Sequence, residues 1–376
     1  MSEPSGINNS NHRYRQLDTL RGLAAFFVFL SHYILVFKFS SNWVSYLSES
    51  PLGVLINGRA AVMFFFVLSG FVLSLPFVEN NRPLKFTEFY IKRIFRIYPA
   101  YLFAILFAVI LKTFVYRQSD MQSFSPWVGH FWTWQWNAKT IKEVIKTCLI
   151  IGPHFNADLI VPVIWSLVVE MQMSLVLPFF IILVSKSKGW YNILFFIITL
   201  ILIYNRFVGF LGVFYLGILL AKYRHYFVDR VKNLSTWVLI ILICICTVAY
   251  NIGGWMPYNY KDHSHPFQFF WRDYANTLSC CIIIIIVISK TRTAVLLTNK
   301  TFIFLGDISY SFYLLHLPIL ITVTSLCSAV FLPGLFIFLC SLAAAIIVAY
   351  LSFRFIEKPF QWYAKVLVKK LHAKHF

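Results

Sequence analysis

Long apolar runs recur along the whole sequence and constrain its fold more than any other feature. An α-helix needs about 17–25 apolar residues to cross roughly 30 Å of hydrocarbon, and ten runs approach or reach that length. The predicted fold class is therefore all-α: a polytopic integral membrane bundle of about ten transmembrane helices. The predicted spans are residues 17–37, 60–78, 98–116, 161–184, 190–204, 207–221, 236–252, 271–289, 301–324 and 331–353.

Composition and charge agree with a membrane location. The chain is 59% hydrophobic and 12% charged, whereas soluble domains are about a quarter charged. The net charge of +19 does not indicate nucleic acid, because the cations cluster in short segments between spans. Most Lys and Arg fall on one side when alternate segments are assigned to the two faces. The positive-inside rule then predicts that both termini are cytoplasmic.

The spans divide the chain into three predicted parts. Residues 1–16 form a cytoplasmic N-terminal tail, residues 17–353 the transmembrane domain, and residues 354–376 a basic cytoplasmic C-terminal tail. The longest segment between spans covers roughly residues 117–160. Because no soluble domain of useful size is apparent, we expect the function to reside in the membrane bundle.

Ionisable residues inside the spans are the functional candidates. Each costs about 2.5–3.5 kcal/mol at a helix centre on insertion scales and is rarely retained without a role. His32 lies in the first span, Glu170 in the fourth and His316 in the ninth, with Asp307 lower in the ninth. The alternating directions of the spans bring the first three to a similar depth. Since isolated buried charges seek partners, we predict one shared polar site in the outer half of the bundle.

The first span also places two polar residues on one face. Arg21 and His32 are eleven residues apart, which corresponds to about 20° around a helix and about 16 Å along it. Arg21 is then at the cytoplasmic mouth and His32 in the outer half of the bilayer. This pattern predicts a polar path along one helix face.

Each candidate also has a simpler interpretation. His32, His316 and Tyr313 could be packing residues. Glu170 could be a protonated contact between helices, and Asp307 a helix cap.

Five motifs, in order, resemble the membrane-bound acyltransferase 3 family. The first, LDTLRGLAAFFVFLSHY, contains that family's spacing of Arg or Lys, ten residues and His, at Arg21 and His32. The second is RAAVMFFFVLSGFVLS (59–74). The third, FYIKRIFRIYPAY (89–101), contains Arg-x-x-Arg at Arg93 and Arg96. The fourth and fifth are WSLVVE (165–170) and SYSFYLLH (309–316).

The resemblance implies an enzyme with ten core spans that uses acetyl-CoA or a related acyl donor. We predict no metal. It points to the stand-alone type without an SGNH hydrolase-like domain, such as O-acetyltransferases of O-antigen or exopolysaccharide. The implied location is the bacterial cytoplasmic (inner) membrane. The acceptor is then a hydroxyl of an extracytoplasmic or lipid-linked cell-surface glycan.

Residue roles follow from this chemistry. A neutral imidazole suits removal of a hydroxyl proton near neutral pH, so His32 is the predicted general base, as the resemblance also implies. Glu170 is predicted to orient the His32 ring or stabilise its imidazolium. Direct transfer and an acetyl-histidine intermediate both fit these residues. The predicted supporting or substrate residues are Asp18, Trp165, Ser309, Tyr313 and His316.

Three arginines are predicted to bind the donor. Arg93 and Arg96, with Arg21, are suited to its phosphates through charge-assisted hydrogen bonds. Composition alone favours ordinary positive-inside residues for Arg93 and Arg96, and the matching motif favours the donor role.

The sequence leaves alternatives for the role of the aromatic segments and for the function. Segments 127–136 and 253–271 are rich in aromatic residues that could stack on sugars, although an interfacial aromatic belt is the more ordinary interpretation. His263 and His265 are too sparse in neighbouring ligands to predict a metal. The main alternative function is a transporter or flippase that uses Glu170 and the histidines for substrate or proton coupling. A structural scaffold is a third, and would not need aligned ionisable groups.

Overall fold

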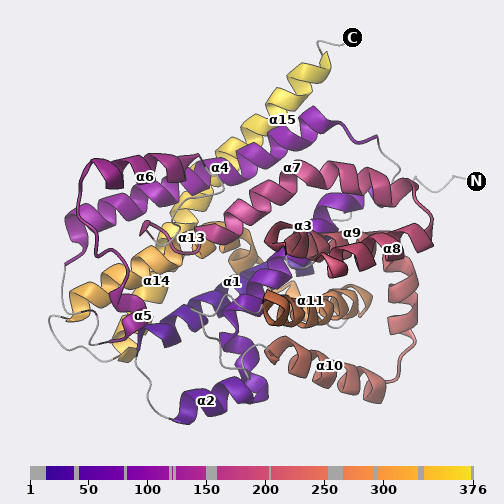
Figure 1. The fold of residues 1–376 in the computed structure, drawn as a ribbon, viewed down its shortest axis with the longest axis horizontal. Helices are drawn as coiled ribbons and strands as arrows, with labels where there is room; N and C mark the ends of the chain where they lie inside the picture. The colour runs from indigo at the N-terminus through magenta and orange to yellow at the C-terminus, as the bar shows by residue number, and fades with distance from the viewer. Residues whose placement is uncertain are drawn as a thin grey trace, which may run out of the picture.

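The computed structural model describes residues 14–37, 42–79, 83–117, 121, 124–149, 159–202, 205–252, 266–290, 295–328 and 334–373. Helices and their connections make up this part of the chain, which contains no β-strand. The predicted all-α fold class is confirmed. The main helices are α1 (Arg15–Val36), α2 (Asn42–Glu49), α3 (Gly58–Glu79), α4 (Phe86–Ile110), α5 (Pro126–Gly129), α6 (Ala138–Cys148), α7 (Ile164–Lys186), α8 (Gly189–Ile201), α9 (Arg206–Lys232), α10 (Thr236–Asn251), α11 (Pro266–Ser289), α13 (Lys300–Ser328), α14 (Gly334–Ser352) and α15 (Lys358–Ala373). A 3₁₀ turn, η1 (Pro51–Ile56), and two π-helical turns, η2 (Leu111–Val115) and η5 (Phe353–Glu357), complete the elements (Figure 1).

Eight helical segments in the described part are long and apolar enough to cross a membrane. They coincide with eight of the ten predicted spans. The other two, 190–204 and 236–252, coincide with the shorter apolar helices α8 and α10. With 13 and 16 residues, these helices extend about 20 and 24 Å, less than the hydrocarbon thickness of about 30 Å.

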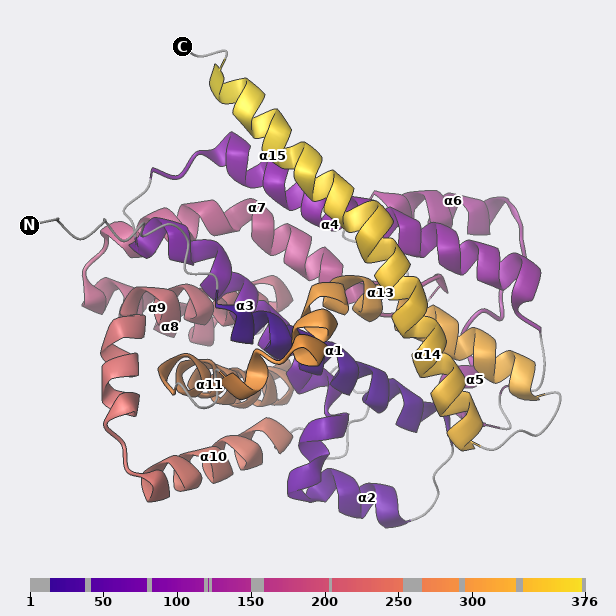
Figure 2. The same ribbon diagram turned by 180° about the vertical axis from the view of Figure 1, so that it is seen from behind.

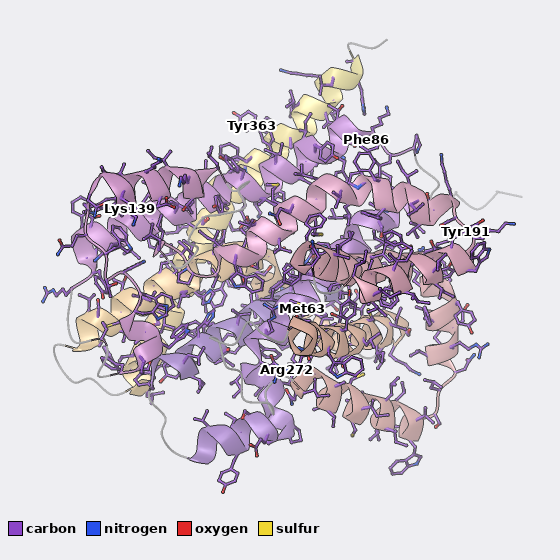
Figure 3. The ribbon with its side chains drawn as sticks, in the orientation of Figure 1. Met63, Phe86, Lys139, Tyr191, Arg272 and Tyr363 are labelled. Atoms are coloured by element: carbon purple, nitrogen blue, oxygen red, sulfur yellow. The ribbon has the colours of Figure 1, made fainter. Side chains whose placement is uncertain are left out.

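Helix α13 lies in the middle of the bundle. In its most apolar window 83% of the residues are buried, whereas only 22% are buried in the corresponding window of the outer segment Gly334–Ala373. Helix α1 contacts both α13 and α3, and α3 packs against α7, α9 and α11. Figure 3 shows the same contrast between centre and rim: Met63 of α3 lies in the middle of the view, and Lys139, Tyr191 and Tyr363 lie at the edges. The helices that carry the candidate site residues therefore meet in the core.

Glycines lie at two close helix crossings. A Cβ atom on Gly22 of α1 would lie 2.6 Å from the Leu305 carbonyl carbon, and one on Gly306 of α13 would lie 2.5 Å from the Asp18 oxygen. At the second crossing, a Cβ atom on Gly70 of α3 would lie 2.2 Å from the Phe214 oxygen of α9. Small residues let helix backbones approach closely in membranes, where van der Waals packing holds the helices together. The first crossing sets how α1 and α13 face each other.

We expect Gly70→Ala to destabilise the bundle, because the added methyl group meets backbone atoms that can move only with their helix. The expected loss is about 1–3 kcal/mol, measured as a lower melting temperature in detergent. Gly189→Ala is the matched control, since a Cβ atom there would meet only the Tyr223 hydroxyl, at 3.4 Å. Equal melting temperatures for the two variants would contradict the prediction.

The C-terminal basic segment is helical rather than an extended tail. α14 continues through η5 into α15, and α15 packs beside α4 (Figure 2). Glu357, the last residue of η5, is only 1% exposed. The sequence predicts this residue in the basic C-terminal tail, whereas the structure buries its carboxylate against α4 and α13.

Candidate active site

An imidazole of α1 and an imidazole of α13 form a pair near the end of α1. His32 lies one turn before the end of α1, and its Nδ1 is 2.8 Å from Nε2 of His316 on α13. The two rings are within 9° of parallel. His316 is completely buried, with Phe29, Phe312 and Tyr313 around it. His32 thus faces the interior of the bundle.

The hydrogen bonds of this pair assign its tautomers. His316 Nδ1 lies 3.2 Å from the Phe312 carbonyl oxygen, which can only accept, so Nδ1 carries the proton of neutral His316. Its Nε2 then accepts the hydrogen bond from His32 Nδ1. A neutral His32 therefore has its lone pair on Nε2, and no described residue hydrogen-bonds to that atom.

A second cluster pairs Arg93 of α4 with Glu170 of α7. Arg93 Nη2 donates to Glu170 Oε1 at 2.8 Å. Its Nε and Nη2 also donate to Ser174 Oγ, at 3.0 and 2.8 Å. Ser69 of α3 donates to the same Glu170 oxygen at 3.3 Å. Arg93 is 8% exposed, so the charges of this pair compensate each other inside the protein.

This geometry corrects the partner predicted for Glu170. The sequence predicts that its carboxylate orients the His32 ring. In the structure it binds the Arg93 guanidinium, and His316 contacts the His32 ring. The reason is electrostatic: a buried carboxylate gains more from a cation than from a neutral imidazole. The single shared site predicted from helix depth is therefore two adjacent clusters.

The three predicted donor-binding arginines line one cavity of about 100 Å³. Arg21, Arg93 and Arg96 contribute three positive charges to its wall, and Glu170 contributes one negative charge. Ser309 and Tyr313, two of the predicted supporting residues, also line it. The excess positive charge makes the cavity suitable for an anion.

Several guanidinium nitrogens at this cavity are available to a ligand. Arg21 uses Nη1 for Asp18, at 3.3 Å, and Arg96 uses Nη1 for Glu357, at 3.1 Å. Within the described ranges, Nη1 of Arg93 and both Nε and Nη2 of Arg21 and Arg96 have no hydrogen-bond acceptor. These donors fit phosphate oxygens, which guanidinium groups bind with directional, charge-assisted hydrogen bonds.

Glu357 is a site residue that the sequence analysis missed. Besides Arg96, it accepts hydrogen bonds from Ser311 Oγ at 2.5 Å and from Ser311 N at 3.2 Å. These hydrogen bonds connect η5 to α13 and, through the ion pair with Arg96, to α4. The available signal was a lone acidic residue in the basic, aromatic stretch FRFIEKPFQW.

Tyr313 separates the cavity from the imidazole pair. Its ring lines the cavity and lies 5.9 Å from the His316 ring. Its hydroxyl is 2.7 Å from Ser166 Oγ of α7. Tyr313 therefore links the wall of the cavity to the imidazole pair.

Trp165 belongs to a different cluster. The Arg59 guanidinium lies 4.9 Å from its ring centre and forms an ion pair with Asp273 of α11, with nitrogen–oxygen distances of 2.6 and 2.9 Å. Trp165 is not among the cavity-lining residues.

No group of three or more His, Cys, Asp or Glu side chains suited to a metal is found in the part of the chain that the structure describes. His263 and His265 lie outside the described residues.

The fold and site define a multi-pass membrane protein with ionisable clusters in its core. Residues 14–354 match the family model Acyl_transf_3, described as an acyltransferase domain. The chain therefore belongs to the acyltransferase 3 family, as the five motifs predicted.

Two similar proteins come from Staphylococcus aureus. One is O-acetyltransferase OatA of strain NCTC 8325 / PS 47, 26% identical over 382 residues that cover 92% of this chain and 57% of the relative. Another is the putative O-acetyltransferase SACOL0978 of strain COL, 23% identical over 388 residues that cover 93% and 58%. The chain thus spans somewhat more than half of the length of these relatives. No solved structure matches it.

Proposed function

We propose that this protein is an O-acyltransferase of the bacterial cytoplasmic membrane. It moves an acetyl or similar acyl group from acyl-CoA to a hydroxyl of an extracytoplasmic or lipid-linked glycan. The observation that carries this proposal is the His32–His316 pair, which leaves one imidazole nitrogen unprotonated and is linked through Tyr313 to a cation-lined cavity. The family and the printed names of the relatives support the reaction class.

His32 Nε2 is the proposed general base. It accepts the proton of the acceptor hydroxyl as that oxygen attacks the acyl carbon. The resulting imidazolium keeps its Nδ1–H bonded to His316 Nε2, and the His316 Nδ1–H is bonded to the Phe312 carbonyl. This chain spreads the new positive charge without moving a heavy atom, as expected of a preorganised base. The base then returns the proton to the departing thiolate.

The arginine-lined cavity is the proposed donor site. Its free guanidinium nitrogens and excess positive charge fit the phosphates of acyl-CoA, which supplies an activated thioester. Asp18, Glu170 and Glu357 hold Arg21, Arg93 and Arg96 in place. Part of each guanidinium is thereby fixed before the donor binds.

The proposed orientation places the start of α1 at the cytoplasmic face, in agreement with the charge asymmetry of the sequence. Arg21 and His32 then lie about 16 Å apart along α1. The donor enters from the cytoplasm, and the acyl group reaches an acceptor near the opposite face.

Purified protein in nanodiscs tests this proposal. With acetyl-CoA labelled in the acetyl group and a glycan extract from bacterial envelopes, we expect release of free CoA and label in the glycan. A transporter would instead move solute across proteoliposomes without consuming the thioester. Envelope glycans with the same acyl content in cells with and without the gene would refute the proposal.

His316 should act by orienting His32. His316→Leu removes the acceptor for His32 Nδ1–H, so we expect kcat to fall about 10- to 100-fold, the value of one hydrogen bond to a charged group. His316→Gln keeps an oxygen acceptor at a similar reach and should lose less. The measurement is kcat with acetyl-CoA at saturation. Equal kcat values for the two variants would contradict the orienting role.

A further inference from the structure

The first turn of α4 and the last turns of α15 line a second cavity, of about 500 Å³. Its apolar wall consists of Leu84 and Phe86 at the start of α4 and Val368 and Leu371 of α15. Figure 3 shows Phe86 beside the last turns of α15. The cavity shares no lining residue with the proposed donor site.

Two basic side chains lie at one end of this cavity. Lys85 Nζ is 3.4 Å from His372 Nε2, so the two groups converge from α4 and α15. Glu88 also lines the cavity, with a carboxylate oxygen 3.7 Å from His372 Nε2. Lys92, in the next turn of α4, pairs with Glu88 and compensates its negative charge. The polar end of the cavity therefore has excess positive charge and adjoins an apolar wall.

The exposed sides of α15 are those of a helix at a membrane surface. The helix carries four lysines and no acidic residue. Lys358, Lys365 and Lys369 are exposed and lie within about 40° of one another around the helix. Tyr363 and Leu367 are exposed on the opposite side. A helix with a cationic strip and an apolar strip suits the boundary between lipid headgroups and hydrocarbon.

The order of the helices places the cavity at the level of the headgroups. α14 is an apolar helix of 19 residues, about 28 Å long, which is close to the hydrocarbon thickness. It continues through η5 into α15, and α15 runs beside α4 (Figure 2). The charge asymmetry of the sequence assigns this end of α14 to the cytoplasmic side. The cavity then opens at the inner leaflet.

We propose that this cavity binds an anionic glycerophospholipid of the inner leaflet. The lipid phosphate lies at Lys85 and His372, and part of an acyl chain lies on Phe86, Val368 and Leu371. Charge complementarity supports this occupant, because basic pockets between helices at the cytoplasmic side fit anionic headgroups. A small soluble anion would leave the apolar wall without a partner. The inference goes beyond the proposed transferase and does not depend on it.

Native mass spectrometry of the purified chain in detergent tests this inference. The probes are dioleoyl phosphatidylglycerol and dioleoyl phosphatidylcholine, which have the same acyl chains and differ in net charge. We expect the anionic lipid to bind about tenfold more tightly than the zwitterionic one. Lys85→Gln combined with His372→Gln removes both basic groups. It should lower the affinity for the anionic lipid about five- to thirtyfold and leave the affinity for the zwitterionic lipid unchanged.

Two further variants separate the cavity from general attraction between charges. Leu371→Trp fills the cavity and keeps every charge, so it should also weaken binding of the anionic lipid, by about tenfold. It keeps the test decisive if the Lys85 and His372 variant does not fold. Lys186→Gln combined with Lys232→Gln is the matched control, because it removes two exposed lysines at the ends of α7 and α9. This control should bind both lipids as wild type does.

Each contrary result has a defined meaning. Equal affinities for the two lipids would overturn the anionic assignment. Unchanged binding by Leu371→Trp, or an equal loss in the Lys186 and Lys232 control, would overturn the site. Displacement of the anionic lipid by soluble CoA, with a weaker affinity for CoA after Lys85→Gln, would assign the cavity to a soluble nucleotide instead. None of these measurements uses acyl transfer, so their failure would leave the proposed function intact.

Discussion

His32→Ala protein is expected to lose about 10²- to 10⁴-fold in the rate of acyl transfer, the usual contribution of a general base. The substitution removes the only imidazole nitrogen of the pair that is free for the acceptor hydroxyl, because both nitrogens of His316 are engaged within α13 and by His32. The change is from a large to a small side chain at a partly exposed position, so the bundle should still fold. The measurement is single-turnover transfer from labelled acetyl-CoA with the donor saturating.

His130→Ala is the matched control for that experiment. His130 is an exposed histidine at the same end of the bundle, with its ring against Phe131, and the described residues show no hydrogen bond or ring contact between it and the imidazole pair. It should keep wild-type activity. Near-normal transfer by His32→Ala, with an unchanged melting temperature, would rule out His32 as the base.

Arg93→Ala is expected to affect both stability and donor binding. It leaves the Glu170 carboxylate without its cation in the protein interior, which costs about 3–5 kcal/mol when one partner of a buried pair is removed. It also deletes one of the three cations of the proposed phosphate site. We expect a large fall in melting temperature and weaker binding of acetyl-CoA, measured by isothermal titration in nanodiscs.

The double variant Arg93→Met with Glu170→Leu separates these two effects. Replacing both charges by apolar groups removes the uncompensated carboxylate, so most of the stability should return. The phosphate contact does not return, so acetyl-CoA binding should stay weak. Lys92→Ala is the control, because Lys92 is half exposed and pairs with Glu88 on the surface, where an ion pair contributes less than about 1 kcal/mol. Wild-type affinity in the double variant would show that Arg93 is structural only.

The predicted spans agreed with the structure where a single helix carries the signal. The apolar runs of α1, α3, α7, α13 and α14 are each visible in the sequence without knowledge of their neighbours, because hydrocarbon sets the required length. The start of α4 was less predictable. The run of cations and aromatics from residue 86 to residue 97 is too polar to be recognised as part of a span, yet it forms the first half of a 25-residue helix.

Pairing between helices could not be predicted in the same way. Helical periodicity placed Arg21 and His32 on one face of α1, and depth placed His32, His316 and Glu170 near one another. Depth alone could not assign partners, since all three residues approach the same level. The partner of each residue depended on which helices are neighbours and on how far each side chain reaches. The long Arg93 side chain reaches Glu170 and forms an ion pair with it.

The amino-acid sequence by itself determined a helical membrane bundle, the family, and the residues whose presence in lipid needs an explanation. Tertiary structure alone decided that His316 contacts His32, that Glu357 pairs with Arg96, and that Trp127 lies beside the proposed base. The physical reason is that hydrophobic length and helical periodicity are properties of one segment. Hydrogen bonds and ion pairs between segments depend on which helices touch, and in this chain glycine crossings such as Gly22 on Gly306 set that contact.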